Sequence, residues 1–181
     1  DWPAPYGIVL VLDRLSALMV ALTSFLGMAV VLAALSGTDR RGRYFHAFLQ
    51  FQMMGLNGAF LTGDLFNLFV FFEILLLASY GLLVHGGGVE RARAGIAYVV
   101  LNLSGSALFL IALGLLYGFL GTLNMADFGV ALQAVAPADQ GVVAVMCMLL
   151  VTVFLLKAAV LPIGFWLPHV YTAATLPVAA L

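Results

Sequence analysis

Glu73 and Lys157 are the two residues of this sequence whose surroundings point most directly to a chemical function. Each lies inside an apolar run that is long enough to cross a lipid bilayer, where an ionised side chain is costly and usually functional. A buried carboxyl and a buried amine can each gain or lose a proton when a partner charge approaches or withdraws. We therefore predict that these two side chains carry protons through a membrane.

Glu73 follows Asp64 by nine residues. At 1.5 Å per residue it lies roughly 13 Å into a helix that starts there, near the centre of a hydrocarbon core about 30 Å thick. The residues expected on its face, among them Phe66, Phe69 and Tyr80, offer no opposite charge. The alternative is a structural glutamate that only forms a hydrogen bond to another helix.

Lys157 precedes Pro162 by five residues. It would lie about 22 Å along a helix that begins near Val142, somewhat past the middle. A desolvated lysine can exchange a proton near neutrality, or it can stay charged beside a carboxylate such as Glu73. The alternative is that its side chain extends to the membrane surface near Pro162.

Asp64 and His169 are candidates for an accessory proton path. Asp64 stands where a helix cap is expected, and it could in addition deliver protons from outside. His169 lies two residues before Tyr171 in a proline-interrupted segment and could relay protons, but it is equally consistent with a residue at the membrane surface. We interpret His46 and His85 as surface residues because both lie near the ends of predicted spans.

Small and polar residues recur between residues 95 and 120. Asn102, Ser104 and Ser106 could line a hydrated path, although hydrogen bonds between helices explain them equally well. Gly114 and Gly118 have the spacing that allows two helices to approach closely in lipid. This stretch is therefore predicted to contact neighbouring helices.

The composition identifies an integral membrane protein: 65% of residues are hydrophobic, 8% are charged and the mean hydropathy is +1.17. The net charge of −1 gives no indication of a nucleic-acid partner. A single cysteine, Cys147, excludes an intrachain disulfide, and three scattered histidines give no metal-ligand spacing. The only glycine run joins two apolar spans and lacks the context of a phosphate-binding loop, so no cofactor or metal site is predicted.

The lengths of the apolar runs predict an all-α, polytopic transmembrane helical bundle. We expect one transmembrane domain over residues 1–181, which we interpret as an internal fragment of a longer protein. Pro162, Pro168 and Pro177 predict a discontinuous last helix, of the kind tolerated where protein or a hydrated cavity surrounds it. The predicted spans are approximately 6–35, 44–62, 64–85, 95–120 and 142–161, followed by a broken helix over 163–181.

The loop charges divide between the two sides of this predicted bundle. Arginines at positions 40, 41, 43, 91 and 93 fall on one side, and Asp1, Asp64, Asp127 and Asp139 fall on the other. By the positive-inside rule the arginine side is cytoplasmic, and the connection over 121–140 is external. Arg14 is the exception, and it would be accommodated by pairing with Asp13 or by extending to the membrane surface.

Three segments resemble one known family. They are TGDLFNLFVFFEILLLASYGLL (62–83), YVVLNLSGSALFLIALGLLYGFLGTLNMAD (98–127) and LLKAAVLPIGFWLP (155–168). Together and in this order they are similar to the D subunit of the multisubunit Mrp-type Na+/H+ antiporters, also named Mnh or Pha. More distantly, they resemble the antiporter-like, proton-translocating subunits of respiratory complex I and of membrane-bound hydrogenases.

The resemblance implies that Glu73 and Lys157 form a charge pair at the centre of a proton half-channel. It also implies a secondary transporter subunit, not an enzyme, that exchanges protons for Na+ or another monovalent cation. Its partners would be the other subunits of a hetero-oligomeric complex in the cell membrane of a prokaryote. The position after the WLP motif varies in the family, so His169 inherits no role from the resemblance.

Two other functions remain open from the sequence. The same helices would serve in a redox-driven proton pump of the complex I or membrane-bound hydrogenase type, which a peripheral arm with iron–sulfur clusters would reveal. Alternatively, the fragment is a structural scaffold in which the buried charges only fix helix packing. Retained transport after both charges are neutralised would favour the scaffold.

Overall fold

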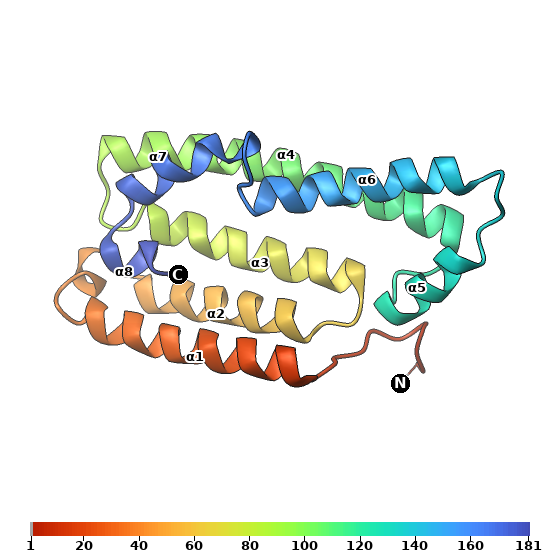
Figure 1. Cartoon of the computed structure of the whole chain (residues 1–181). Helices are drawn as coiled ribbons and strands as arrows, with labels where there is room; N and C mark the ends of the chain where they lie inside the picture. Colours follow the sequence, from red (N-terminus) through yellow and green to blue (C-terminus); the bar gives the residue numbers. More distant parts are fainter. Residues whose placement is uncertain (1) are drawn as a thin grey trace.

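The computed structural model describes residues 2–181, and Asp1, which the sequence assigns to the external side, lies outside the described residues. Within this range the chain is all-α, as predicted, and contains no β-strand (Figure 1). Two short 3-10 helices cover Asp39–Arg41 and Ile163–Phe165. The α-helices are α1 (Arg14–Ala34), α2 (Phe45–Leu61), α3 (Leu65–Leu83), α4 (Val89–Leu120), α5 (Met125–Gln133), α6 (Gln140–Lys157), α7 (Trp166–Ala173) and α8 (Leu176–Ala179).

The long helices form a bundle in which neighbours along the chain run side by side (Figure 1). α2 packs between α1 and α3, while α4 contacts both α3 and α6. Among the described residues, α1, α3, α4 and α6 are long and apolar enough to cross a membrane. α2 has 17 residues, the lower end of the usual range for a transmembrane helix. The chain is therefore a multi-pass membrane protein.

The apolar run predicts that the first helix begins near Tyr6. In the structure it begins at Arg14. Residues 8–12 are not helical, and their backbone pairs with the turn after α2: Val11 N–H donates to Leu61 O at 2.6 Å, and Gly63 N–H donates to Val9 O at 3.0 Å. Asp13 caps α1 by accepting a hydrogen bond from Ser16 N–H, which holds the pKa of this carboxyl below its usual value. No ion pair joins Asp13 to Arg14 in the described part of the chain.

The turn at residues 62–64 forms backbone hydrogen bonds with two separate segments of the chain. Besides its contact with the N-terminal segment, it pairs with the start of the connection after α4, where Leu65 N–H donates to Leu123 O and Met125 N–H donates to Gly63 O. The Asp64 carboxylate accepts a hydrogen bond from Asn67 N–H at 2.9 Å and caps α3. The predicted cap is confirmed.

α4 begins at Val89, six residues earlier than its predicted start at Gly95. Glu90, Arg91 and Arg93 therefore lie in its first turns and not in the preceding loop. Arg91 contacts backbone carbonyls of two other segments, with Nε 3.1 Å from Ala173 O and Nη1 2.9 Å from His85 O. The Arg91 side chain therefore connects the start of α4 to the end of α7 by a hydrogen bond.

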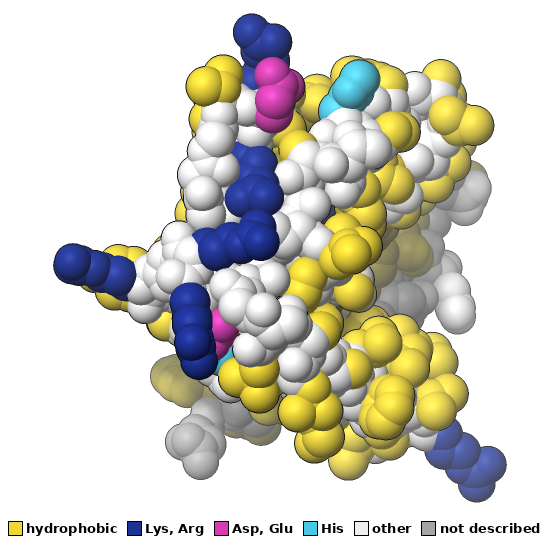
Figure 2. Space-filling model, turned by 90° about the vertical axis from the view of Figure 1, so that its left-hand side faces the viewer, with side chains coloured by type: hydrophobic (Ala, Val, Ile, Leu, Met, Phe, Trp, Pro, Cys, Tyr) yellow, Lys and Arg dark blue, Asp and Glu magenta, His cyan; other side chains and the backbone are white. Residues whose placement is uncertain are grey.

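Figure 2 shows basic side chains gathered on the end of the bundle where the α1–α2 and α3–α4 connections lie; they are arginines, because the single lysine, Lys157, ends α6. His85 is buried at this end with 7% exposure, and its Nε2 lies 2.9 Å from Thr38 O. The interpretation of His85 as a membrane-surface residue is wrong, because the loop between α1 and α2 covers it. His46 is half exposed, and its Nε2 lies 3.6 Å from a carboxylate oxygen of Asp39.

Candidate functional site

Glu73 of α3, Ser106 of α4 and Lys157 of α6 meet in the interior of the bundle. The Ser106 hydroxyl donates a short hydrogen bond to Glu73 Oε1, and Lys157 Nζ donates to Ser106 Oγ at 3.2 Å. Among the described residues the only ion pair within 4.0 Å is that of His46 with Asp39, so Glu73 and Lys157 are joined through the hydroxyl and not directly. Ser106 is buried with 4% exposure, and the two charged residues are half-buried.

A glycine brings α4 close enough to α6 for this contact. A Cβ atom at Gly105 would lie 2.5 Å from Leu156 Cδ2, a distance that real Cβ atoms do not show. Because Ser106 follows Gly105 and Lys157 follows Leu156, the close approach places the hydroxyl within reach of the amine. The prediction of a close helix contact at Gly114 and Gly118 is wrong within the described residues. A Cβ atom added at either glycine would have no atom of another described helix within 4 Å.

Four phenylalanine rings pack beside the site. Phe109 of α4 is fully buried, and its ring centroid lies 5.7 Å from that of Phe69, 6.1 Å from that of Phe72 and 5.4 Å from that of Phe154. Lys157 Nζ also lies 5.5 Å from the centroid of the Phe72 ring, close enough for a cation–π interaction. An apolar wall of this kind lowers the local dielectric constant, which strengthens the electrostatic interaction between charged groups beside it.

The sequence predicts that Lys157 lies inside a helix that continues to residue 161. In the structure Lys157 is the last residue of α6. The helix ends because Ala159 adopts a left-handed conformation with φ of 51°, before Pro162 is reached. The C-terminus of a helix carries partial negative charge, which favours a cation there. The break in the helix therefore places Lys157 at the helix end whose polarity suits a cation.

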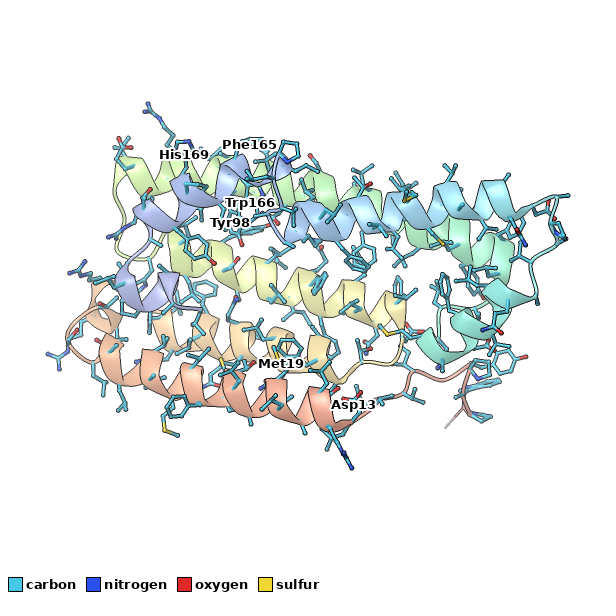
Figure 3. All side chains as sticks on the ribbon, in the orientation of Figure 1. Asp13, Met19, Tyr98, Phe165, Trp166 and His169 are labelled. Carbon is cyan, nitrogen blue, oxygen red and sulfur yellow. The ribbon has the colours of Figure 1, made fainter. Side chains whose placement is uncertain are left out.

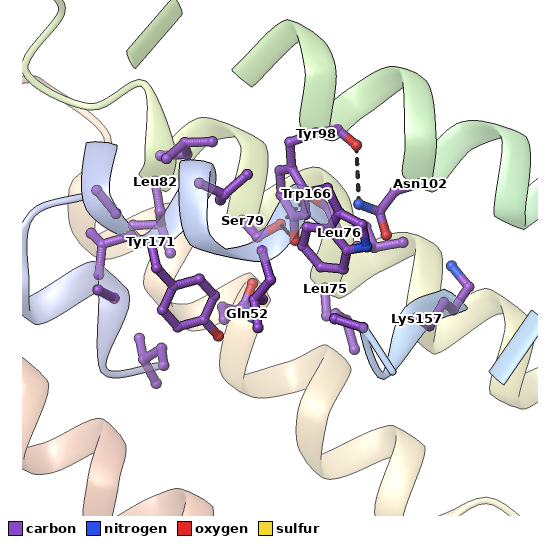
Figure 4. Close-up of a pocket in the computed structure, with 18 of the residues that line it drawn as sticks. Gln52, Leu75, Leu76, Ser79, Leu82, Tyr98, Asn102, Lys157, Trp166 and Tyr171 are labelled. Carbon is purple, nitrogen blue, oxygen red and sulfur yellow. Dashed lines mark hydrogen bonds between the residues drawn. The ribbon is translucent and has the colours of Figure 1, made fainter. Parts of the chain in front are cut away.

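A cavity of about 630 Å³ lies beside Lys157, between α2, α3, α4 and α7 (Figure 4). Polar side chains on its wall include Gln52, Ser79, Tyr98 and Asn102. Gln52 Oε1 is buried, and no described residue lies within hydrogen-bond distance of it. The cavity is large enough for water, most of its wall is apolar, and Lys157 and these polar side chains are the groups that bound water would contact.

Aromatic stacking fixes the broken segment against the rest of the bundle (Figure 3). Trp166, the first residue of α7, stacks on Tyr98 of α4 with centroids 5.4 Å apart and an interplanar angle of 28°. Tyr98 also contacts Tyr80 edge-on at 5.1 Å, and its hydroxyl lies 3.0 Å from Ser79 Oγ. These contacts hold α7 over the cavity.

The two accessory candidates do not lie with the charged pair. Asp64 is engaged as the cap of α3, nine residues before Glu73. His169 is exposed on α7 and lines a second cavity of about 440 Å³, together with Glu90 and Arg93 at the start of α4. It is not among the residues that line the cavity at Lys157.

Ser106 is the site residue that sequence reasoning did not single out. Its type and position are equally consistent with a hydrogen bond between helices, and only the Gly105-Ser106 pair of small residues signals a close helix contact. Asn102, considered with it, donates to Tyr98 O within α4. Over residues 2–181 no group of three or more His, Cys, Asp or Glu side chains could hold a metal ion.

Residues 62–181 match the family model described as "NADH:quinone oxidoreductase/Mrp antiporter, TM". Over 179 residues the chain is 55% identical to the D subunit of a probable K(+)/H(+) antiporter from Rhizobium meliloti (strain 1021), covering 99% of this chain and 33% of that protein. It is 43% identical to the D subunit of the Na(+)/H(+) antiporter from Bacillus subtilis (strain 168), covering 99% of this chain and 36% of the relative. The chain thus spans about a third of the length of these relatives.

Two solved structures share the fold. A chain of the Mrp complex from Dietzia sp. DQ12-45-1b matches with a TM-score of 0.88 and 36% identity, over 98% of this chain and 33% of that one. A chain of the membrane-bound sulfane sulfur reductase, an archaeal respiratory membrane complex, matches with a TM-score of 0.86 and 32% identity, over 99% and 36%. Both similarities extend over nearly the whole of this chain.

Proposed function

This chain belongs to the NADH:quinone oxidoreductase/Mrp antiporter transmembrane family, and from that premise we propose that it is part of a subunit that exchanges protons for a monovalent cation. The observation that carries the proposal is the chain of contacts from Glu73 through Ser106 to Lys157. An acid and a base in hydrogen-bonded contact inside a membrane protein are suited to proton transfer.

In this function Glu73 and Lys157 act as an electrostatic switch. When both are ionised, they attract each other more strongly than in bulk water, because the phenylalanine rings lower the dielectric constant on one side of the site. A protonation change elsewhere along the path would weaken this attraction, and one proton would then move on. The cavity beside Lys157 supports a hydrated connection toward the arginine-rich end of the bundle.

The transported cation is proposed from the relatives. One is named for K+ and the other for Na+, so either ion fits the proposal. The subunit would work inside a hetero-oligomeric complex, as the similarity to a chain of an Mrp complex supports. Its location would be the cell membrane of a prokaryote, with the arginine-rich end facing the cytoplasm.

Neutralising either charged residue tests this function. In the full-length subunit, assembled in its complex in inverted membrane vesicles, Glu73→Ala and Lys157→Ala should each abolish proton release on addition of NaCl or KCl. The measurement is the fluorescence of a pH-sensitive dye in the vesicles, with co-purification of the other subunits showing intact assembly. Wild-type rates in both variants would defeat the proposal.

Surface charges provide matched controls for these substitutions. Asp139 and Arg43 are exposed and do not line the cavity at Lys157. Asp139→Ala and Arg43→Ala should leave transport near the wild-type rate. The double variant of Glu73 and Lys157 tests the scaffold alternative, because a purely structural pair would leave transport intact once both charges are removed together.

We propose only accessory roles in the proton path for Asp64, at the end of the bundle proposed as external, and for His169, near Glu90 and Arg93 at the arginine-rich end. Asp64→Asn keeps a cap for α3 and removes the acid, and His169→Ala removes the imidazole. If either group belongs to the path, its variant should slow transport without abolishing it. Wild-type rates in these variants would remove the residue from the path and leave the pair of Glu73 and Lys157 unaffected.

A redox-driven proton pump is the second candidate function, and the similarity to a chain of an archaeal respiratory complex favours it. The two functions differ in their source of energy. A purified complex that contains iron–sulfur clusters, detected by electron paramagnetic resonance, would indicate the pump. Cation-driven proton release from a complex without such clusters would indicate the antiporter.

A further inference from the structure

We propose that the Ser106 hydroxyl is the group through which a proton passes between Lys157 and Glu73. This inference rests on the proposed function and specifies how the two charged residues communicate. Among the described residues, Ser106 is the one side chain that forms hydrogen bonds to both of them. It is buried between α3, α4 and α6.

The hydrogen bonding of Ser106 differs from that of other hydroxyl groups in the long helices. A helical serine or threonine usually donates back to a carbonyl of its own helix. Ser104, two residues away on α4, does so with Val100 O at 2.8 Å, and Thr152 on α6 does so with Met148 O at 2.8 Å. Ser106 instead directs its proton across to Glu73 on α3 and leaves its oxygen free to accept from Lys157.

A hydroxyl can donate one hydrogen bond while it accepts another, which is the requirement for a relay. In the forward step an N–H bond of the Lys157 ammonium breaks, and its proton joins Ser106 Oγ. In concert the original O–H bond of Ser106 breaks, and that proton joins Glu73 Oε1. The products are a neutral amine, an intact hydroxyl and a neutral carboxylic acid, so atoms and charge balance without another reactant.

The relay also needs a reset. After the step, the new hydroxyl proton of Ser106 points toward the Lys157 nitrogen. Once Glu73 has passed its proton onward and Lys157 has gained one, the hydroxyl rotates about its Cβ–Oγ bond and again donates to Glu73. This rotation moves only the hydroxyl proton, so the oxygen stays between the two groups.

Ser106→Ala tests the relay in the full-length subunit within its complex. The substitution removes one oxygen atom and keeps the Cβ, so packing between α3, α4 and α6 is preserved. We expect cation-driven proton release to fall by about a hundredfold or more, the scale of losing one proton-transfer group. Ser106→Thr retains a hydroxyl and should restore transport to within about threefold of the wild-type rate.

The solvent isotope effect separates a relay from a structural role. Loss of the hydroxyl makes proton transfer the slow step, so the ratio of rates in H2O and D2O should rise in Ser106→Ala above its value in the wild type. A residue that only positions the helices would slow transport and leave this ratio unchanged. The matched control is Ser104→Ala on the same helix, which should keep both the rate and the ratio of the wild type.

Two results would overturn the relay: a wild-type rate in Ser106→Ala, or a reduced rate with an unchanged isotope ratio. Either result can be told apart from failure of the proposed function, because Glu73→Ala and Lys157→Ala would still abolish transport. If Ser106→Thr fails to assemble, the rate and isotope ratio of Ser106→Ala decide the question alone.

Discussion

At the scale of the residue, the site is an acid and a base held apart by one hydroxyl. Each partner is positioned by a different feature: Glu73 by the capped helix α3, Ser106 by the glycine before it, and Lys157 by the end of α6. The arrangement keeps both charged groups near each other without a direct ion pair. A buried ion pair in direct contact is harder to separate because the attraction is stronger at short distance.

Lys157→Arg distinguishes a proton carrier from a fixed charge. Arginine remains protonated under all physiological conditions, so it can hold a positive charge at the site and cannot release a proton. We expect the complex to assemble as in the wild type while cation-driven proton release is lost. Transport at the wild-type rate in this variant would show that position 157 supplies only charge.

At the scale of the element, the approach of α4 to α6 and the break after α6 decide the geometry. The turn from Ala158 to Phe165 is tight: a Cβ atom at Gly164 would lie 2.0 Å from Ala159 O. Behind this turn, the stacking of Trp166 on Tyr98 holds α7 against α4. The broken helix therefore forms a fixed wall of the cavity next to Lys157.

Alanine substitution of two glycines in α4 measures the helix contact. In Gly105→Ala the new methyl group meets the end of the Leu156 side chain, which must shift. We expect a loss of stability of up to about 1–3 kcal/mol, the usual cost of overpacking, and slower transport. Gly114→Ala in the same helix meets no described atom and should be neutral or stabilise by up to about 1 kcal/mol through helix propensity. Thermal unfolding of the purified complex compares the two.

Equal stability of the two glycine variants, with equal transport, would contradict the close contact between α4 and α6. A loss of transport in Gly105→Ala without a loss of stability would instead locate the effect at the contact between Ser106 and Lys157. Each variant serves as the control for the other, because both substitutions add one methyl group to the same helix.

At the scale of the whole molecule, the two ends of the bundle differ in charge. Basic side chains gather at the end formed by the α1–α2 connection and the start of α4 (Figure 2). At the other end, the N-terminal segment, the α2–α3 turn and the start of the connection after α4 are joined by backbone hydrogen bonds. This asymmetry sets the expected orientation in the membrane.

Cysteine labelling tests this orientation. In a background with Cys147→Ala, Arg43→Cys should react with a membrane-impermeant thiol reagent in inverted vesicles, and Asp139→Cys should react only in vesicles of the opposite orientation. Both positions are exposed at the surface of the described chain. The reverse pattern of labelling would place the arginine-rich end outside.

The sequence by itself determined the all-α membrane class, the cap at Asp64 and the presence of two charged residues, Glu73 and Lys157, inside apolar runs, because apolar length, capping and charge position are local properties of a chain. Tertiary structure alone decided that Ser106 joins the pair, that Gly105 and not Gly114 forms the close contact, and that His85 is buried. The reason is physical: in a helix that is apolar on every side, periodicity does not reveal which face meets a neighbour. The rotation of each helix is fixed only when side chains of different helices pack together.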